Sequence, residues 1–219
     1  MYAGTVTPGD PTAVRELDAL TIRKCSVSSM DNNSYLLTCT RTGRQLLIDA
    51  ADDAPRLMEL VAEGTGSLDL IVTTHQHWDH VRALKELVAA TGARTASGAD
   101  DADALPVPVD TRLAQGDQVR FGEVTLDVVH LSGHTPGSVA LAYVDPNGHS
   151  HLWTGDALFP GGVGSTSQPG QSFESLLADV SERIFDVYDD STWVYPGHGA
   201  DTTLGAERPH LDEWRARGW

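Results

Sequence analysis

One stretch of eight residues, Thr-Thr-His-Gln-His-Trp-Asp-His at positions 73–80, constrains the fold of this chain more than any other. The apolar run at 68–72 before it predicts a buried strand, and the spacing of apolar residues over 81–90, with Gly92 just beyond, predicts a helix. The stretch therefore lies at the carboxyl end of a strand. Functional side chains of layered α/β proteins usually gather at that edge.

Four side chains of this stretch are of the kinds that bind metal ions. In extended backbone, residues two apart point to the same side, so His75 and His77 can present their imidazoles to one ion. At the turn into the helix, Asp79 and His80 can face a second ion beside the first. Two structural alternatives are open, because Asp79 could instead cap the helix and Trp78 could be a packing residue. We favour the metal site, since a core has little use for four clustered polar groups that each need a partner.

Composition and charge limit the classes of function. The 219 residues, 40% of them hydrophobic, suffice for one well-packed domain, and we predict a single domain over residues 1–219 because no linker or repeat divides them. The formal charge of −16 repels polyanions, so nucleic acid is not an expected partner. Residues 1–10 do not resemble a secretory signal, and no stretch is long and apolar enough to span a bilayer. We therefore expect a cytoplasmic location and no membrane partner.

The two cysteines fall in segments that resemble neighbouring strands. Cys25 and Cys39 are both far in sequence from the histidine-rich stretch. We interpret them as buried thiols, because a disulfide is disfavoured in the cytosol.

Hydrophobic periodicity predicts most of the remaining elements. Strands are expected at 20–27, 34–40, 45–50, 118–121, 124–131, 139–144, 151–154 and 192–195. Helices are expected at 54–62 and from 173 onward, the second with a core-covering apolar face of Phe173, Leu176, Leu177, Val180, Ile184 and Val187. The segment 105–109 contains two prolines and is expected to be extended. Asp100, Asp101 and Asp103 before it predict a solvated loop.

Three further ligand-type residues stand at predicted strand ends. His134, Asp156 and His198 each have a glycine neighbour, which lets the backbone bring the side chain close to a shared centre. His149 and His151 flank a turn, and we interpret them as surface residues. We interpret His130, which lies in a predicted strand, as a structural residue or as a support for a ligand.

Four separated motifs resemble those of a known family. They read THQHWDH at 74–80, GHTPGS at 133–138, TGDALF at 154–159 and PGHG at 196–199. In this order they resemble the metallo-β-lactamase superfamily and, within it, the glyoxalase II-like hydrolases, and the resemblance extends over nearly the whole chain from about Asn32. It implies an α/β protein with an αββα sandwich, in which two mixed β-sheets face each other, helices flank them, and two metal ions lie at one edge.

The resemblance also implies a ligand set and a mechanism. The implied ligands are His75, His77 and His134 for one ion and Asp79, His80 and His198 for the other, with Asp156 bridging the two. Two divalent ions about 3.5–4 Å apart lower the pKa of a shared water toward about 7, and the resulting bridging hydroxide attacks a thioester carbonyl. Asp79 would also orient this nucleophile. Ligands without cysteine suit zinc, with iron or manganese as alternatives.

This chain departs from glyoxalase II in what surrounds the implied metal centre. Glyoxalase II usually has two glycines where Val81 and Arg82 stand, and a histidine where Ser138 stands. Its basic glutathione-binding residue looks replaced around positions 164–165, and its C-terminal helical domain has no counterpart in the short tail after His198. We therefore expect a hydroxyacyl-thiol hydrolase with a different thiol carrier, with residues 159–171 forming part of the pocket. The acyl group and the oligomeric state are left open.

Other activities of the same superfamily remain alternatives. A lactonase or a β-lactamase would use the same two ions, although a secreted β-lactamase needs an export signal. A persulfide dioxygenase would need a single iron held by His75, His134 and Asp156. A flavodiiron protein is disfavoured because it has a glutamate where His77 stands, and a nuclease because it needs an inserted domain and a basic surface. A non-catalytic metal-binding scaffold is also disfavoured, since all seven ligand positions are filled.

Overall fold

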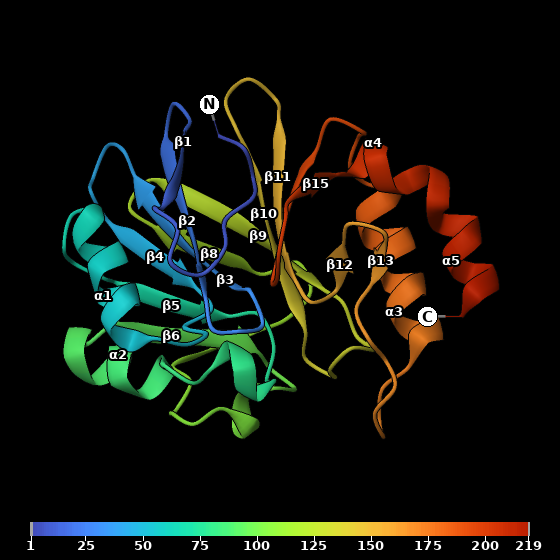
Figure 1. Ribbon diagram of the computed structural model, residues 1–219, viewed down its shortest axis with the longest axis horizontal. Helices are drawn as coiled ribbons and strands as arrows, with labels where there is room; N and C mark the ends of the chain where they lie inside the picture. Colours follow the sequence, from blue (N-terminus) through green and yellow to red (C-terminus); the bar gives the residue numbers. More distant parts are fainter. Residues whose placement is uncertain (1, 219) are drawn as a thin grey trace.

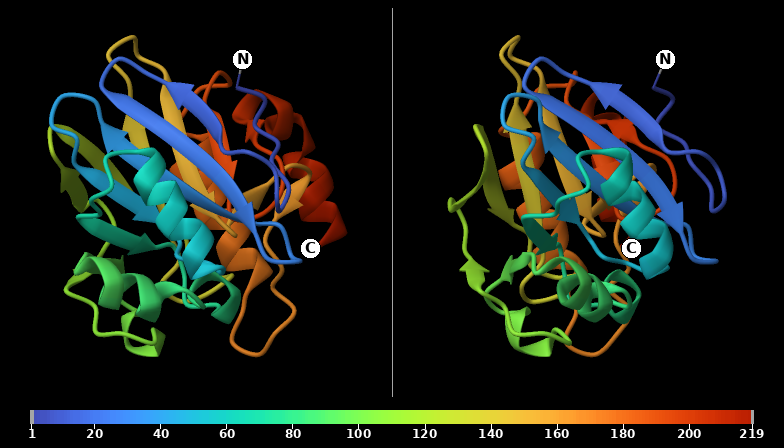
Figure 2. Two further views of the ribbon diagram at one scale, coloured as in Figure 1. Left: turned by 60° about the vertical axis from the view of Figure 1, so that its left-hand side comes forward. Right: turned by 90° about the vertical axis from the view of Figure 1, so that its left-hand side faces the viewer.

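The computed structural model describes residues 2–218, and these form two mixed β-sheets packed face to face with helices on their outer sides (Figures 1 and 2). The predicted αββα sandwich is therefore confirmed. The core between the sheets joins apolar residues of both, for example Leu37 and Leu46 of one sheet with Leu126, Leu141 and Trp153 of the other. No helix within residues 2–218 is both long and apolar enough to cross a membrane.

The first sheet has seven strands that follow one another in chain order. They are β1 (Ala13–Glu16), β2 (Leu20–Val27), β3 (Asn32–Cys39), β4 (Gln45–Ile48), β5 (Leu70–Thr73), β6 (Arg94–Gly98) and β7 (Thr111–Leu113). Pairing is antiparallel from β1 to β4 and parallel from β4 to β7. Every residue of β3 is buried, because Leu37 faces the other sheet while Leu36 packs on the helical side.

The second sheet has six strands in the spatial order β15-β14-β11-β10-β9-β8. Their bounds are β8 (Gln118–Phe121), β9 (Val124–His130), β10 (Val139–Val144), β11 (Ser150–Gly155), β14 (Trp193–Pro196) and β15 (Thr202–Thr203). Only β11 and β14 pair in parallel among these neighbours, so the loops that follow these two strands leave at the same edge. A separate hairpin joins β12 (Leu158–Phe159) and β13 (Gly162–Val163).

Helices cover the outer face of each sheet (Figure 1). The first sheet carries α1 (Ala54–Glu63) and α2 (Leu84–Thr91), and the second carries α3 (Phe173–Val180), α4 (Leu204–Glu207) and α5 (Leu211–Arg217). Single turns η1 (Trp78–His80), η2 (Ala102–Ala104) and η4 (Arg208–His210) are 3₁₀-helical, and the turn η3 (Ser181–Phe185) extends α3 as a π-helix. Two helices begin with a side-chain cap. The Ser172 side chain accepts a hydrogen bond from Ser175 N at the start of α3, and the Asp53 side chain accepts one from Arg56 N at the start of α1.

All nine predicted strands, including that at 68–72, and the helix at 54–62 are confirmed within two residues of their bounds. The helix expected at 81–90 instead begins at Leu84, after the turn η1. Strands β1, β6, β7, β12, β13 and β15 were not predicted, because their sequences are only two to five residues long and show little alternation. Val187 is 64% exposed, contrary to prediction, because the π turn η3 inserts an extra residue per turn and rotates Val187 off the apolar stripe. Cys25 and Cys39 are buried free thiols, as expected.

The prediction of a surface position for His151 is wrong. This residue of β11 is fully buried, while His149 is exposed as expected. Alternation along the strand turns His151 toward the core between the sheets, where its Nδ1 lies 3.0 Å from the hydroxyl of Tyr195. Burial lowers the pKa of His151 to about 4; the nearby Arg15 lowers the pKa further and Asp145 opposes this shift.

The folded protein should therefore lose stability on acidification partly through His151. An unfolded histidine titrates near pH 6.5, so between about pH 6.5 and 4 the unfolded chain binds a proton that folded His151 does not. The stabilising contribution of neutral His151 is complete above that window and declines as the pH falls through it. In thermal unfolding of the metal-free protein, His151→Gln should reduce the drop in Tm between pH 7.5 and pH 5 by at least about 2 °C. His149→Gln is the matched control, and an equal drop in all three proteins would contradict the prediction.

Candidate metal centre

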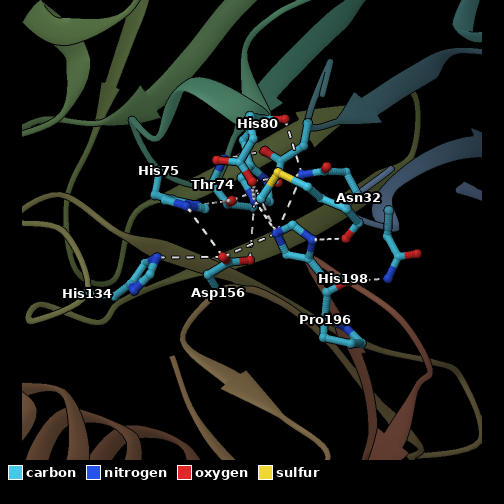
Figure 3. A network of polar contacts seen from close by, with 12 residues as sticks. Asn32, Thr74, His75, His80, His134, Asp156, Pro196 and His198 are labelled. Atoms are coloured by element: carbon cyan, nitrogen blue, oxygen red, sulfur yellow. Dashed lines mark hydrogen bonds and ion pairs between the residues drawn. The ribbon is translucent and has the colours of Figure 1, made fainter. Parts of the chain in front are cut away.

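Four chain segments bring the seven predicted ligand residues to one edge of the sandwich. Figure 3 labels His75, His80, His134, Asp156 and His198 of this group. The residues after β5 supply four of them, and one each comes from the loop after β9, the turn after β11 and the loop after β14. The parallel pair β11·β14 explains why Asp156 and His198 meet, because parallel strands end at the same edge. No predicted ligand residue lies away from the group.

One group consists of His75, His77 and His134, whose ligand nitrogens lie within 4.8 Å of one another. The Nδ1 of His134 donates to Ser165 O at 2.7 Å, which leaves its Nε2 facing the group. The Nδ1 of His75 donates to Thr74 Oγ1 at 3.0 Å. Burial lowers the pKa of His75, and neighbouring imidazoles lower it further, so the ring is neutral as a metal ligand requires.

A second group consists of Asp79, His80 and His198, with ligand atoms again within 4.8 Å of one another. The Nε2 of His198 lies 3.3 Å from Asp79 Oδ2 and 3.1 Å from His80 Nε2. The outer ring nitrogens are held from behind, since His80 Nδ1 donates to Asp49 Oδ2 at 2.9 Å and His198 Nδ1 donates to Met30 O at 2.7 Å. Such bonds fix the orientation of ligand rings.

Asp156 lies between the two groups. Its carboxylate oxygens are 3.6 Å from His134 Nε2 on one side, and 3.3 Å from His80 Nε2 and 3.4 Å from His198 Nε2 on the other. A β-carbon at Gly197 would overlap Asp156 Oδ1, so only glycine lets the loop after β14 pass this close. The position of Asp156 is that expected of a bridging ligand.

The unpartnered atoms of the site fit a pair of divalent cations. The Nε2 atoms of His75 and His134 and the Oδ1 of Asp156 are buried and have no hydrogen-bond partner among residues 2–218. Leaving such atoms unsatisfied costs about 1–3 kcal/mol each, a cost that a bound cation would remove. Burial lowers the pKa of His198, but the contact with the Asp156 carboxylate outweighs burial and raises this pKa to about 10. The site therefore favours positive charge. Nitrogen and oxygen donors of this kind suit zinc, iron or manganese.

Both structural alternatives for the histidine-rich stretch are wrong. Asp79 does not cap α2, because it lies in η1 while the N-cap position of α2 is Ala83. Trp78 is 56% exposed rather than packed in the core, with the guanidinium of Arg82 stacked 4.0 Å from its ring centroid. His130 has a supporting contact, since its Nε2 donates to Pro136 O at 2.8 Å within the segment that carries His134.

Several residues that hold the ligand side chains in place were not predicted from the sequence. Asp49 at the end of β4 accepts from Thr74 N at 2.7 Å and from Thr74 Oγ1 at 2.8 Å, besides holding His80. Asn32 donates to Asp79 Oδ2 at 3.0 Å. The adjacency of β4 and β5 was a usable signal for Asp49, because residues that end neighbouring parallel strands lie side by side.

The prediction of a solvated loop around Asp101 is also wrong for that residue. Asp101 is fully buried, whereas Asp103 is exposed and paired with Arg112. The carboxylate of Asp101 accepts hydrogen bonds from the two segments that carry the first group of ligands. Clustered aspartates have the same local sequence whether they face water or the interior, so no local pattern separates Asp101 from Asp103.

A buried ion pair anchors the loop of His198. Lys24 is fully buried, and its Nζ donates to Asp201 Oδ1 at 2.6 Å, to Gly199 O at 2.7 Å and to Gly4 O at 2.9 Å. This one amine therefore joins β2, the N-terminal segment and the chain just beyond His198.

The chain is similar to a known protein family and to curated proteins. The family described as the metallo-beta-lactamase superfamily matches residues 30–204. The hydroxyacylglutathione hydrolase of Fuscovulum blasticum is 38% identical over 148 residues, which are 67% of this chain and 56% of that protein. The chain thus spans about half the length of the curated relatives it matches.

Two solved structures resemble the chain over most of its length. The crystal structure of ETHE1 from Myxococcus xanthus has a TM-score of 0.79 at 27% identity, covering 89% of this chain and 84% of that one. The crystal structure of TTHA1623 in a di-iron-bound form has a TM-score of 0.70 at 33% identity, covering 84% of this chain and 95% of that one.

The metal content of variants tests the position of Asp156. We expect the protein to retain two divalent ions per chain after dialysis and Asp156→Ala to lose at least one, because the carboxylate contacts both groups. His149→Ala should retain both ions, since His149 is exposed on a distant turn. Elemental analysis by mass spectrometry gives the numbers, and equal losses in the two variants would show that the ligand set is wrong.

The Lys24–Asp201 pair should contribute strongly to stability. Lys24→Met leaves the Asp201 carboxylate, which is 1% exposed, without its cation, and we expect a loss of about 3–5 kcal/mol in the free energy of unfolding. Urea denaturation of the metal-free protein measures this loss. Arg41→Met, which breaks the exposed pair with Glu123, is the control and should cost about 1 kcal/mol or less. Similar losses in both variants would contradict the expectation.

Proposed function

The chain belongs to the metallo-β-lactamase superfamily, and on that premise we propose that it is a glyoxalase II-like hydrolase that cleaves thioesters with the help of two divalent metal ions. The observation that carries the proposal is the convergence of two ligand groups on one shared carboxylate, that of Asp156. The names of the curated relatives, hydroxyacylglutathione hydrolases at 34–41% identity, favour a thioester as the substrate.

In this proposal each ligand group holds one ion. His75, His77 and His134 would hold the first, Asp79, His80 and His198 would hold the second, and Asp156 would be shared by the two groups. When bound, such a pair lowers the pKa of a water toward neutrality and stabilises the charge that develops on the substrate carbonyl oxygen. We propose zinc as the ion. Iron is the alternative with support from a relative, because TTHA1623 was crystallised in a di-iron-bound form, and manganese also suits these donors.

The Asp79 carboxylate orients the attacking water. Although burial opposes ionisation, the contact with His198 and the neighbouring His80 hold the pKa of Asp79 below its ordinary value, with a further hydrogen bond from Asn32. The group is therefore ionised at neutral pH and accepts a hydrogen bond from the water. Because Asn32 and His198 fix the carboxylate, the water is held in one orientation toward the carbonyl carbon.

A thioester suits a site of this kind. Its thiol has a pKa near 8.5, so the thiolate leaves without prior protonation. A hollow of about 440 Å³, lined by residues 163–167 and Gly218, lies beside His134, because Ser165 both lines it and accepts the His134 hydrogen bond. We propose that this hollow receives part of the substrate. The departures at positions 164–165 favour a thiol carrier other than glutathione.

We further propose that residues 1–219 form one domain that acts on a small molecule in the cytoplasm. The apolar core shared by both sheets favours a single folding unit. The free thiols of Cys25 and Cys39 fit a reducing compartment, and the charge of −16 disfavours nucleic acid as a partner.

The alternatives differ in what they require of the second ligand group. A persulfide dioxygenase would use only His75, His134 and Asp156. The hydrogen bonds that fix His80 and His198 from behind favour a second ion and hence the hydrolase. A lactonase would use both groups and is separated from a thioesterase only by its substrate.

Assays on a panel of substrates test the proposal. The metal-loaded protein should hydrolyse S-lactoyl esters of at least one low-molecular-weight thiol, and Asp156→Ala and Asp79→Asn should each lower kcat/KM by about 10²-fold or more. His149→Gln should behave as the wild type. Fast lactone hydrolysis by a protein inert toward every thioester would establish the lactonase instead. One iron per chain with oxygen uptake on a persulfide would establish the dioxygenase.

A further inference from the structure

The buried carboxylate of Asp101 joins the two segments that carry the first ligand group. Its Oδ2 accepts from Gln76 N at 2.9 Å and from Thr135 Oγ1 at 2.6 Å, and its Oδ1 accepts from Gly137 N at 2.7 Å. Gln76 stands between His75 and His77, and Thr135 follows His134 directly. We propose that Asp101 is a positioning residue that sets the distance between these two segments and thereby the metal affinity of the first ligand group.

The two segments need such a connection because they extend from different sheets. Residues 74–80 follow β5 in the first sheet, while His134 follows β9 in the second. A main-chain hydrogen bond from Val139 N to Thr74 O, at 2.9 Å, also links the sheets near this point. Asp101 adds three bonds nearer to the ligands themselves, and it comes from a third segment, just after β6. The separation of His75 from His134 therefore depends on a side chain that binds no metal.

The fit between Asp101 and the second segment is close. A β-carbon at Gly137 would overlap the main-chain nitrogen of Asp101 and lie 2.9 Å from its Cγ, so only glycine lets this segment reach the carboxylate. Since the Thr135 hydroxyl donates to Asp101, it accepts from the Ser138 hydroxyl at 2.6 Å. Thr135 and Gly137 are thus bonded directly to this carboxylate, and Ser138 is linked to it through the Thr135 hydroxyl.

The chemistry of the contacts explains why a carboxylate is required. Two of its partners are main-chain N–H groups that can only donate, and an ionised carboxylate only accepts. In Asp101→Asn, the amide nitrogen would face either Gln76 N or Gly137 N, so one donor would always meet another donor. Metal sites lose affinity when ligands shift by about 0.5 Å, so this mismatch should weaken the first ligand group.

The experiment measures metal affinity rather than catalysis, although the inference rests on the proposed two-metal centre. The full metal-free chain is titrated with Zn²⁺ against a competing chelator, which gives one affinity for each binding step. The variants His134→Ala and His198→Ala identify the step that belongs to each ligand group. Asp101→Asn should weaken the first-group step by about 10–100-fold and change the second-group step by no more than about threefold.

A matched control separates positioning from general stability. Asp69 is a partly buried aspartate that also accepts a main-chain hydrogen bond, from Gln45 N at 2.9 Å, but it precedes β5 and so lies at the opposite end of that strand from the ligands. Asp69→Asn should lower Tm without changing either metal affinity. Unchanged affinities in Asp101→Asn, or an equal weakening of both steps, would overturn the proposal.

A second variant decides the matter if Asp101→Asn does not fold. Thr135→Val keeps the shape of the side chain and removes one of the three bonds, so it should weaken the same step by a smaller factor. An unchanged first-group affinity in Thr135→Val would overturn the proposal. Wild-type protein that binds no divalent ion would overturn it together with the proposed metal centre. Metal binding without thioesterase activity would count against the proposed substrate alone.

Discussion

The structure depends on the desolvation of nitrogen and oxygen atoms at one edge of the sandwich. His75, His80 and His134 are at most 5% exposed, and the Asp156 carboxylate lies among them with one oxygen unpartnered. Removing such groups from water costs free energy that an opposite charge must offset. Here the offsetting charge is positive, because the carboxylates raise the pKa of His80 and His198 despite their burial. Two bound cations would replace the protons that His80 and His198 otherwise carry, and these imidazoles would then be free to act as ligands.

The geometry of this edge is set from outside it. Three of the ligand rings are fixed through their outer nitrogens by groups from other parts of the chain, namely Asp49, Met30 O and Ser165 O. Asp101 and Lys24 act one step further out, each joining segments that extend from different strands. A rigid sandwich with anchored loops holds ligands more accurately than mobile loops could, and this accuracy is what binding and catalysis require.

Two positions near the proposed ligands depart from the pattern that the resemblance to glyoxalase II implies. Ser138, where that pattern has a histidine, contacts the Thr135 hydroxyl. Arg82, where it has a glycine, stacks on the exposed ring of Trp78 and pairs with Asp52. Neither substituted side chain is one of the seven proposed ligand residues, although each lies in a segment that carries one.

The sequence by itself determined most strands, because strand periodicity is a local property, and through its four family-like motifs it indicated the fold class and selected the seven proposed ligand residues that the structure brings together. Only the tertiary structure decided that Asp101 is buried and Asp103 is not, that His151 faces the core, and that Lys24 meets Asp201 across 177 positions of sequence. The physical reason is that burial and pairing depend on which distant segments pack together. A polar residue has the same local sequence whether it contacts water or a buried partner, so its role becomes fixed only when the chain has folded.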